Sequence, residues 1–247
     1  MQRVIKVAAL SALIVATAFV ISLVLHGSSP DQSNDPVDLR AAIIDQLSLT
    51  VPNQTFVAEA TEILEEAGYT VSYYEGEEVT VDFYRKLPTH GYSLIILRVH
   101  SGLGLFGKPP VSFFTSEPFD GSKHTWELFD DRLFIGQYSP HGQDRYFGIA
   151  PKFVALSVKG EFKDTVVVAM GCDSLSFADM AEAFVHKGAK AYIGWNGPVL
   201  ASYMDRAILQ LLKHLVTGNQ LISQAIEETM NEVGADPLNE SILAAYP

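Results

Sequence analysis

The chain has 247 residues, a formal net charge of −12 and a hydrophobic fraction of 48%. This apolar fraction is enough to fill the core of one α/β domain, and the negative charge argues against nucleic-acid binding because few cations remain to neutralise phosphates. Acidic residues are spread along the chain, which is typical of a solvated surface. The single cysteine, Cys172, excludes an internal disulfide framework.

The first residues have the pattern of a membrane-targeting segment. Arg3 and Lys6 precede an apolar run over residues 7–25. A helix of that length spans about 30 Å, the thickness of the hydrocarbon core of a bilayer. The run therefore predicts one transmembrane helix, with a cleaved signal peptide as the alternative.

This segment divides the chain into three parts. We expect a membrane anchor or signal segment over residues 1–26, a flexible linker over 27–37 and a folded domain over 38–247. Because basic residues stay on the cytoplasmic side, the domain of this single-pass protein is expected outside the cytoplasm, or secreted if the segment is cleaved.

Strands and helices are expected to alternate through the folded domain. Short apolar runs predict strands at 41–45, 69–74, 93–99, 164–170 and 189–194. Amphipathic patterns and cap residues predict helices at 53–68, 79–87, 177–186, 200–215 and 221–233. Continuous apolar strands are typical of a parallel sheet covered on both faces, so we expect a three-layer α/β sandwich with a mostly parallel sheet.

A long insertion over residues 101–163 interrupts this alternation. It is aromatic and lacks helical periodicity, and segments 111–114, 133–137 and 153–158 suggest extra strands or hairpins. Long insertions after a core strand usually carry function.

Two chemically active side chains follow predicted core strands. His100 comes after strand 93–99, and Cys172 comes after strand 164–170. Ligands of parallel sheets bind beyond the carboxyl ends of the strands, so neighbouring strands would bring both side chains to one crevice. A thiol beside an imidazole is an activated nucleophile, although a single cysteine or histidine after a strand is more often structural.

The segments LIILRVHSG (94–102) and VVVAMGCDS (166–174) resemble the His and Cys blocks of the caspase-like cysteine peptidases. The resemblance implies a caspase-like fold in which Cys172 attacks the scissile carbonyl and His100 protonates the leaving amine. It also implies an oxyanion hole made by the backbone N–H groups of Ser101 and Cys172. Ser101 stands where the family usually has glycine, which comes one residue later.

Further residues are candidates for the substrate pocket. The resemblance places Asp45 where the pocket for the residue before the cut is built, and an acid there would suit a basic side chain; Asp45 could equally be a cap or turn residue. Asp173 could orient the substrate or cap the helix that follows. Trp195 and Asn196 are expected at the same rim, where Trp195 would line the substrate groove or cover the sheet edge.

The sequence favours a membrane-tethered, extracytoplasmic cysteine peptidase that acts on a peptide or protein substrate. The alternatives are a catalytically inactive ligand-binding ectodomain and an accessory subunit of a membrane complex. No cofactor or metal is expected. Residues 102–107 spell a dinucleotide fingerprint, but Pro109 and Pro110 follow and disfavour the helix start that would hold a pyrophosphate. The sequence does not indicate the oligomeric state.

Overall fold

The computed structural model describes residues 39–247 except 138–143 and 219. The predicted anchor (1–26) and linker (27–37) lie outside the described residues. Among the residues described, no helix is both long and apolar enough to cross a bilayer.

The centre of the domain is sheet A, whose six strands have the order β10-β9-β8-β3-β1-β2. Their bounds are β1 Arg40–Asp45, β2 Thr70–Glu75, β3 Leu94–Arg98, β8 Val166–Ala169, β9 Ala191–Trp195 and β10 Leu243–Tyr246. The strands from β9 to β2 are parallel, and only β10, at the edge, is antiparallel to its neighbour. The predicted α/β class and mostly parallel sheet are therefore confirmed.

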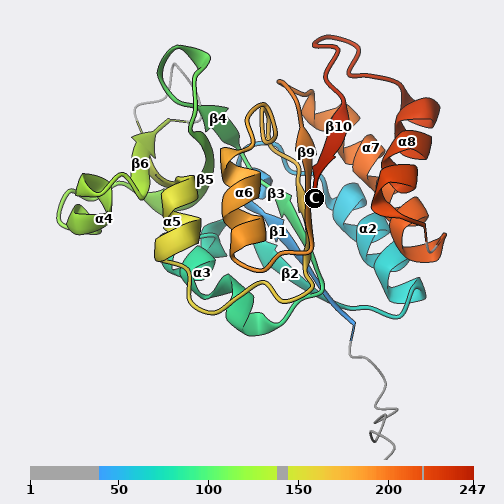
Figure 1. The fold of residues 1–247 in the computed structure, drawn as a ribbon, viewed down its shortest axis with the longest axis horizontal. Coiled ribbons are helices and arrows are strands. Elements are labelled where there is room, and N and C mark those ends of the chain that lie inside the picture. Colours follow the sequence, from blue (N-terminus) through green and yellow to red (C-terminus); the bar gives the residue numbers. More distant parts are fainter. Residues whose placement is uncertain (1–38, 138–143, 219) are drawn as a thin grey trace, which may run out of the picture. The chain divides into compact units, whose positions relative to one another are not determined.

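Helices cover both faces of sheet A (Figure 1). Their bounds are α2 Gln54–Glu66, α3 Val81–Lys86, α6 Asp179–His186, α7 Ala201–Leu212 and α8 Ile222–Val233. In β1, Ala41 and Ile43 pack on the side of α2, α7 and α8, whereas Ala42 and Ile44 pack on the side of α3 and α6. Burial on both faces explains why the strands are continuous apolar runs.

The ends of α2 show how local sequence sets these elements. The side chain of Asn53 accepts a hydrogen bond from the backbone N–H of Phe56, which caps the helix as the sequence predicts. Gly68 follows the helix with a φ of 87°, a conformation that favours glycine. The chain can then turn directly into β2.

The insertion folds mainly into sheet B, an antiparallel sheet with strand order β4-β5-β7-β6. Its strands are β4 Ser101–Leu103, β5 Val111–Pro118, β6 Leu133–Gly136 and β7 Tyr146–Ile149, and its helices are α4 Thr125–Phe129 and α5 Pro151–Leu156. The extended structure expected over 153–158 is wrong. Pro151 stands in the first turn of α5, where its fixed φ suits a helix, and Phe153 and Val154 pack into the core from that helix.

Candidate functional site

The two candidate catalytic residues follow neighbouring strands. β3 and β8 pair in parallel from Leu94–Val166 to Leu97–Ala169, and no strand lies between them. His100 comes two residues after the end of β3, and Cys172 comes three residues after the end of β8. Both residues therefore lie at the same carboxyl edge of sheet A.

The loop that carries Cys172 is attached to the chain that follows β9. The backbone N–H of Asp173 donates to Gly197 O at 2.9 Å, and that of Leu175 donates to Trp195 O at 2.8 Å. Cys172 is partly exposed, and within the described residues its Sγ forms hydrogen bonds with the backbone N and O of Val199, both at 3.5 Å. The thiol is partly exposed, and it also packs against the hydrophobic core on the side of α2 and α7.

The His and Cys segments also touch directly through Ser101 and Gly171. The Ser101 hydroxyl donates a hydrogen bond to the backbone O of Cys172. A Cβ atom added to Gly171 would lie 2.3 Å from Ser101 Oγ and 2.7 Å from Val99 O. Only glycine fits this close approach. The predicted oxyanion donors, the backbone N–H groups of Ser101 and Cys172, thus belong to two segments joined by a hydrogen bond.

The imidazole of His100 is positioned by the segment that follows β1. Its Nε2 lies 2.9 Å from Thr50 Oγ1, and the backbone N–H of His100 donates to Gln46 Oε1 at 2.9 Å. The ring also makes an edge contact with Phe114, with 6.5 Å between ring centroids. Neither Thr50 nor Gln46 belongs to a recognisable motif, so the sequence does not predict their contacts with His100.

The surroundings of the pair favour its neutral forms. Burial, together with the positive charge of Arg98, lowers the pKa of His100. Burial also raises the pKa of the Cys172 thiol, and the carboxylate of Asp173 adds to the effect, against the hydrogen bond with Val199. At neutral pH the site therefore holds a thiol and a neutral imidazole, which is able to accept a proton.

A buried ionic cluster lies beneath this rim. Arg98 donates to both oxygens of Asp205 at 2.8 and 2.9 Å and to Asp45 Oδ1 at 2.7 Å, and the arginine is 0% exposed. Its Nη2 also donates to Val51 O at 2.8 Å, next to Thr50. The cluster thus fixes the segment whose hydroxyl contacts His100. The sequence signal for it was a lone arginine inside an apolar strand.

The cluster decides where Asp45 lies. Asp45 is 1% exposed, and besides Arg98 it accepts a hydrogen bond from Tyr73 Oη at 3.4 Å. Burial raises its pKa, while Arg98 acts in the opposite direction. Asp45 is therefore a buried structural acid, and it does not line a surface where a substrate side chain could reach it.

The other predicted pocket residues occupy different environments. Trp195 is 0% exposed and packs edge-on against Tyr203 in the core, so it does not line a groove. Asn196 is exposed, and its Oδ1 accepts a hydrogen bond from the backbone of Ile242. Asp173 has a φ of 57° and accepts from the Ser176 hydroxyl, which makes it a turn residue beside Cys172. Of the four predicted pocket residues, Asp173 and Asn196 remain at the rim.

The described residues contain no group of three or more His, Cys, Asp or Glu side chains arranged to hold a metal ion. Residues 102–107, which spell the dinucleotide fingerprint, lie in β4 and the turn after it and do not begin an α-helix. In comparisons with known proteins, no family model and no curated protein sequence matches the chain.

Proposed function

We propose that the chain is a membrane-tethered, extracytoplasmic cysteine peptidase of caspase-like fold that cleaves peptide bonds with Cys172 and His100. The observation that carries the proposal is the position of these residues after two adjacent parallel strands, in segments that touch through Ser101 and Gly171. The membrane part rests on the apolar run of residues 7–25.

The proposed reaction begins when His100 accepts the thiol proton and Cys172 Sγ attacks the scissile carbonyl carbon. The C–N bond then breaks, and His100 returns the proton to the leaving amine. Water hydrolyses the resulting thioester, with His100 again accepting and returning a proton. The backbone N–H groups of Ser101 and Cys172 would stabilise the negative oxygen of each tetrahedral intermediate.

The geometry implies that substrate has to activate the pair. Cys172 Sγ is hydrogen-bonded to the backbone of Val199, and His100 Nε2 is hydrogen-bonded to the Thr50 hydroxyl. Catalysis therefore requires the thiol to turn from Val199 toward the substrate. Because Asp45 is held by Arg98, we do not extend the proposal to a preference for basic residues.

A peptidyl acyloxymethyl ketone library tests the proposal, because such probes need both a substrate groove and an activated thiol. Labelling should occur at Cys172 and should fall at least tenfold in His100→Ala. Equal probe labelling in the parent chain and in His100→Ala would rule out the dyad.

A second candidate is a catalytically inactive ligand-binding or accessory ectodomain with the same fold. It is favoured by the thiol itself, since burial and Asp173 raise the pKa of Cys172. In that case no peptidyl probe labels Cys172, and Cys172→Ser retains the cellular function of the parent chain.

A further inference from the structure

The loops that precede the strands of sheet A lie together at the end opposite the candidate site. Ser93 N–H donates to Arg40 O at 2.8 Å, and Val166 N–H donates to Ser93 O at 2.9 Å. Lys190 N–H in turn donates to Thr165 O at 2.8 Å. These bonds join the starts of β1, β3, β8 and β9 into one continuous surface, here called the amino-end face.

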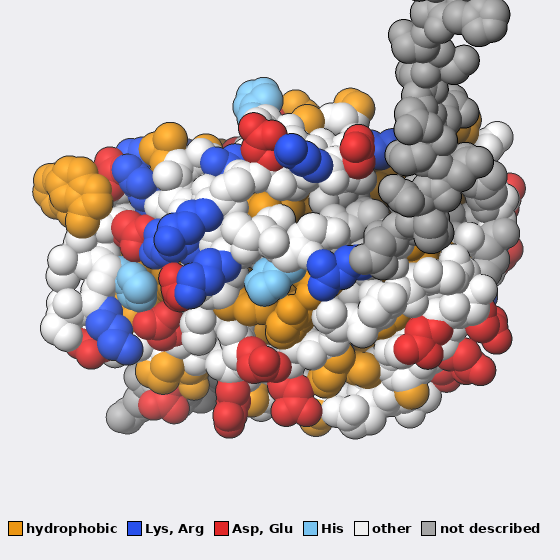
Figure 2. All heavy atoms as spheres, turned by 90° about the horizontal axis from the view of Figure 1, so that it is seen from below, with side chains coloured by type: hydrophobic (Ala, Val, Ile, Leu, Met, Phe, Trp, Pro, Cys, Tyr) orange, Lys and Arg blue, Asp and Glu red, His pale blue; other side chains and the backbone are white. Residues whose placement is uncertain are grey.

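The amino-end face carries a slight excess of positive charge, six basic residues against five carboxylates, although the whole chain is acidic. Its basic residues are Arg40, Lys86, Lys159, Lys163, Lys187 and Lys190. Its loops carry two carboxylates, Glu161 and Asp164, while Asp82 of α3 pairs with Lys86 and Glu65 and Glu66 end α2. Figure 2, which views the domain from below Figure 1, shows Lys and Arg side chains on this face, with Asp and Glu side chains interspersed among them.

Several of these cations are available for an external partner. Within the described residues, no ion pair is formed by Lys159, Lys163, Lys187 or Lys190, and all but Lys187 are well exposed. A lysine ammonium group without a carboxylate partner would be stabilised by an anionic surface.

We propose that the amino-end face docks on the anionic lipid surface of a membrane. Residues 1–39 join the domain at the start of β1, which is on this face, and they include the apolar run of residues 7–25. A chain anchored by that run would hold the amino-end face within reach of lipid headgroups, where each Lys or Arg is attracted to anionic lipid.

An aromatic patch borders the basic residues. A hollow of about 470 Å³ is lined by Arg85, Lys159, Trp126 and Leu156, among others. Trp126 is 64% exposed and Phe129, next to it on α4, is 80% exposed. Exposed aromatic and basic side chains together are typical of surfaces at the membrane interface. Trp126 also provides a reporter, because the other tryptophan, Trp195, is 0% exposed.

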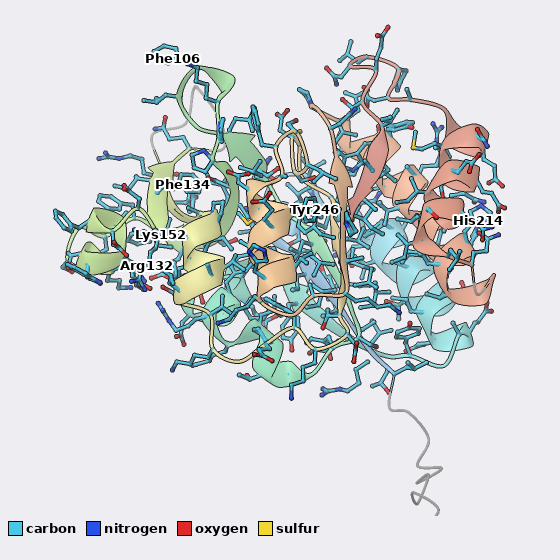
Figure 3. The ribbon with its side chains drawn as sticks, in the orientation of Figure 1. Phe106, Arg132, Phe134, Lys152, His214 and Tyr246 are labelled. Atoms are coloured by element: carbon cyan, nitrogen blue, oxygen red, sulfur yellow. The ribbon has the colours of Figure 1, made fainter. Side chains whose placement is uncertain are left out.

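The docked orientation has a consequence for the proposed peptidase. Cys172 and His100 lie at the carboxyl edge of sheet A, so they would face away from the bilayer. Phe106, labelled in Figure 3, marks the tip of the β4–β5 turn at that same end of the domain. Substrates would then reach the site from the aqueous phase.

Lysine footprinting tests the docking directly. The full chain is placed in nanodiscs of phosphatidylcholine alone or of phosphatidylcholine with phosphatidylglycerol, and the amines are acylated and located by mass spectrometry. Lys163, Lys187 and Lys190 should react several-fold more slowly on the anionic discs. Lys108, an exposed lysine of the β4–β5 turn, is the internal control and should react equally on both. High salt should abolish the protection, because it screens charges at the surface.

Variants identify the residues responsible. Lys163→Glu with Lys190→Glu should remove the lipid-dependent protection of Lys187 and the quenching of Trp126 by brominated phosphatidylglycerol, whereas Lys108→Glu should leave both intact. Equal reactivity on the two kinds of disc, or equal protection of Lys108, would overturn the docking. If the full chain does not enter discs, the same footprinting with added anionic vesicles decides the question. No substrate is used, so failure of docking is distinct from failure of the peptidase.

Discussion

Replacing Gly171 with alanine tests whether the His and Cys segments meet as the structure shows. The new Cβ would lie 2.3 Å from Ser101 Oγ, 2.7 Å from Ser101 Cβ and 2.7 Å from Val99 O. These separations are far below van der Waals contact, and the backbone oxygen of Val99, the buried residue that directly follows β3, cannot easily move. Overpacking of this kind costs about 1–3 kcal/mol, and the short distances favour the upper half of that range.

A double-mutant cycle assigns the cost to this contact. Urea unfolding of residues 38–247 is measured for Gly171→Ala, Ser101→Gly and the double variant. Because Ser101→Gly removes two of the three close contacts, the double variant should be more stable than the sum of the single effects predicts, by about 1 kcal/mol or more. Additive effects would show that Ser101 and Gly171 do not touch, and the juxtaposition of His100 and Cys172 would lose its main support.

Two further predictions concern charge. Because burial and Arg98 lower the pKa of His100, the acid limb of the kcat/KM–pH profile should lie below the usual histidine value of about 6.5. The unfolded chain binds the proton more tightly than the folded chain. This histidine should therefore also lower the free energy of unfolding as the pH falls below about 6.5. Potentiometric or NMR titration of His100 at or above its ordinary value would contradict both. Arg98→Met leaves Asp45 and Asp205 buried without their cation and should lower the free energy of unfolding by about 3–5 kcal/mol. The triple variant that adds Asp45→Asn and Asp205→Asn should recover a large part of this loss. A loss of under about 1 kcal/mol for Arg98→Met in urea unfolding would show that the cluster is not buried as described.

The order of the core elements was predictable because each has a strong local signal. Apolar runs mark β1, β3, β8 and β9, and capping residues such as Asn53 mark the start of a helix. The insertion was harder, because aromatic and β-branched residues fit a strand or one turn of helix equally well. The fixed φ of Pro151 favours the first turn of a helix, and the apolar residues after it pack as well from α5 as they would from a strand.

Of the candidate site, the sequence predicted the placement of only two residues at one edge of the sheet. His100 and Cys172 carry recognisable chemistry and follow recognisable strands. Their partners Thr50 and Val199 are 50 and 27 residues away in sequence and contact them through a hydroxyl and backbone atoms, which no local pattern reveals. Asp45 is an example of the opposite error. A carboxylate at the end of a strand is typical of a functional site, and the sequence does not reveal that Arg98 neutralises this one.

The amino-end face shows why the net charge of the chain does not reveal cations that gather at one end of the sheet. In a parallel sheet every loop that precedes a strand lies at the same end, whatever its distance in sequence. Arg40, Lys163 and Lys190 each stand at or just before the start of a strand, so the topology gathers cations that are up to 150 residues apart. The carboxyl ends, where Cys172 and His100 lie, receive none of these three. The parallel strand directions therefore bring these three cations together at one end of the sheet and leave Cys172 and His100 at the other.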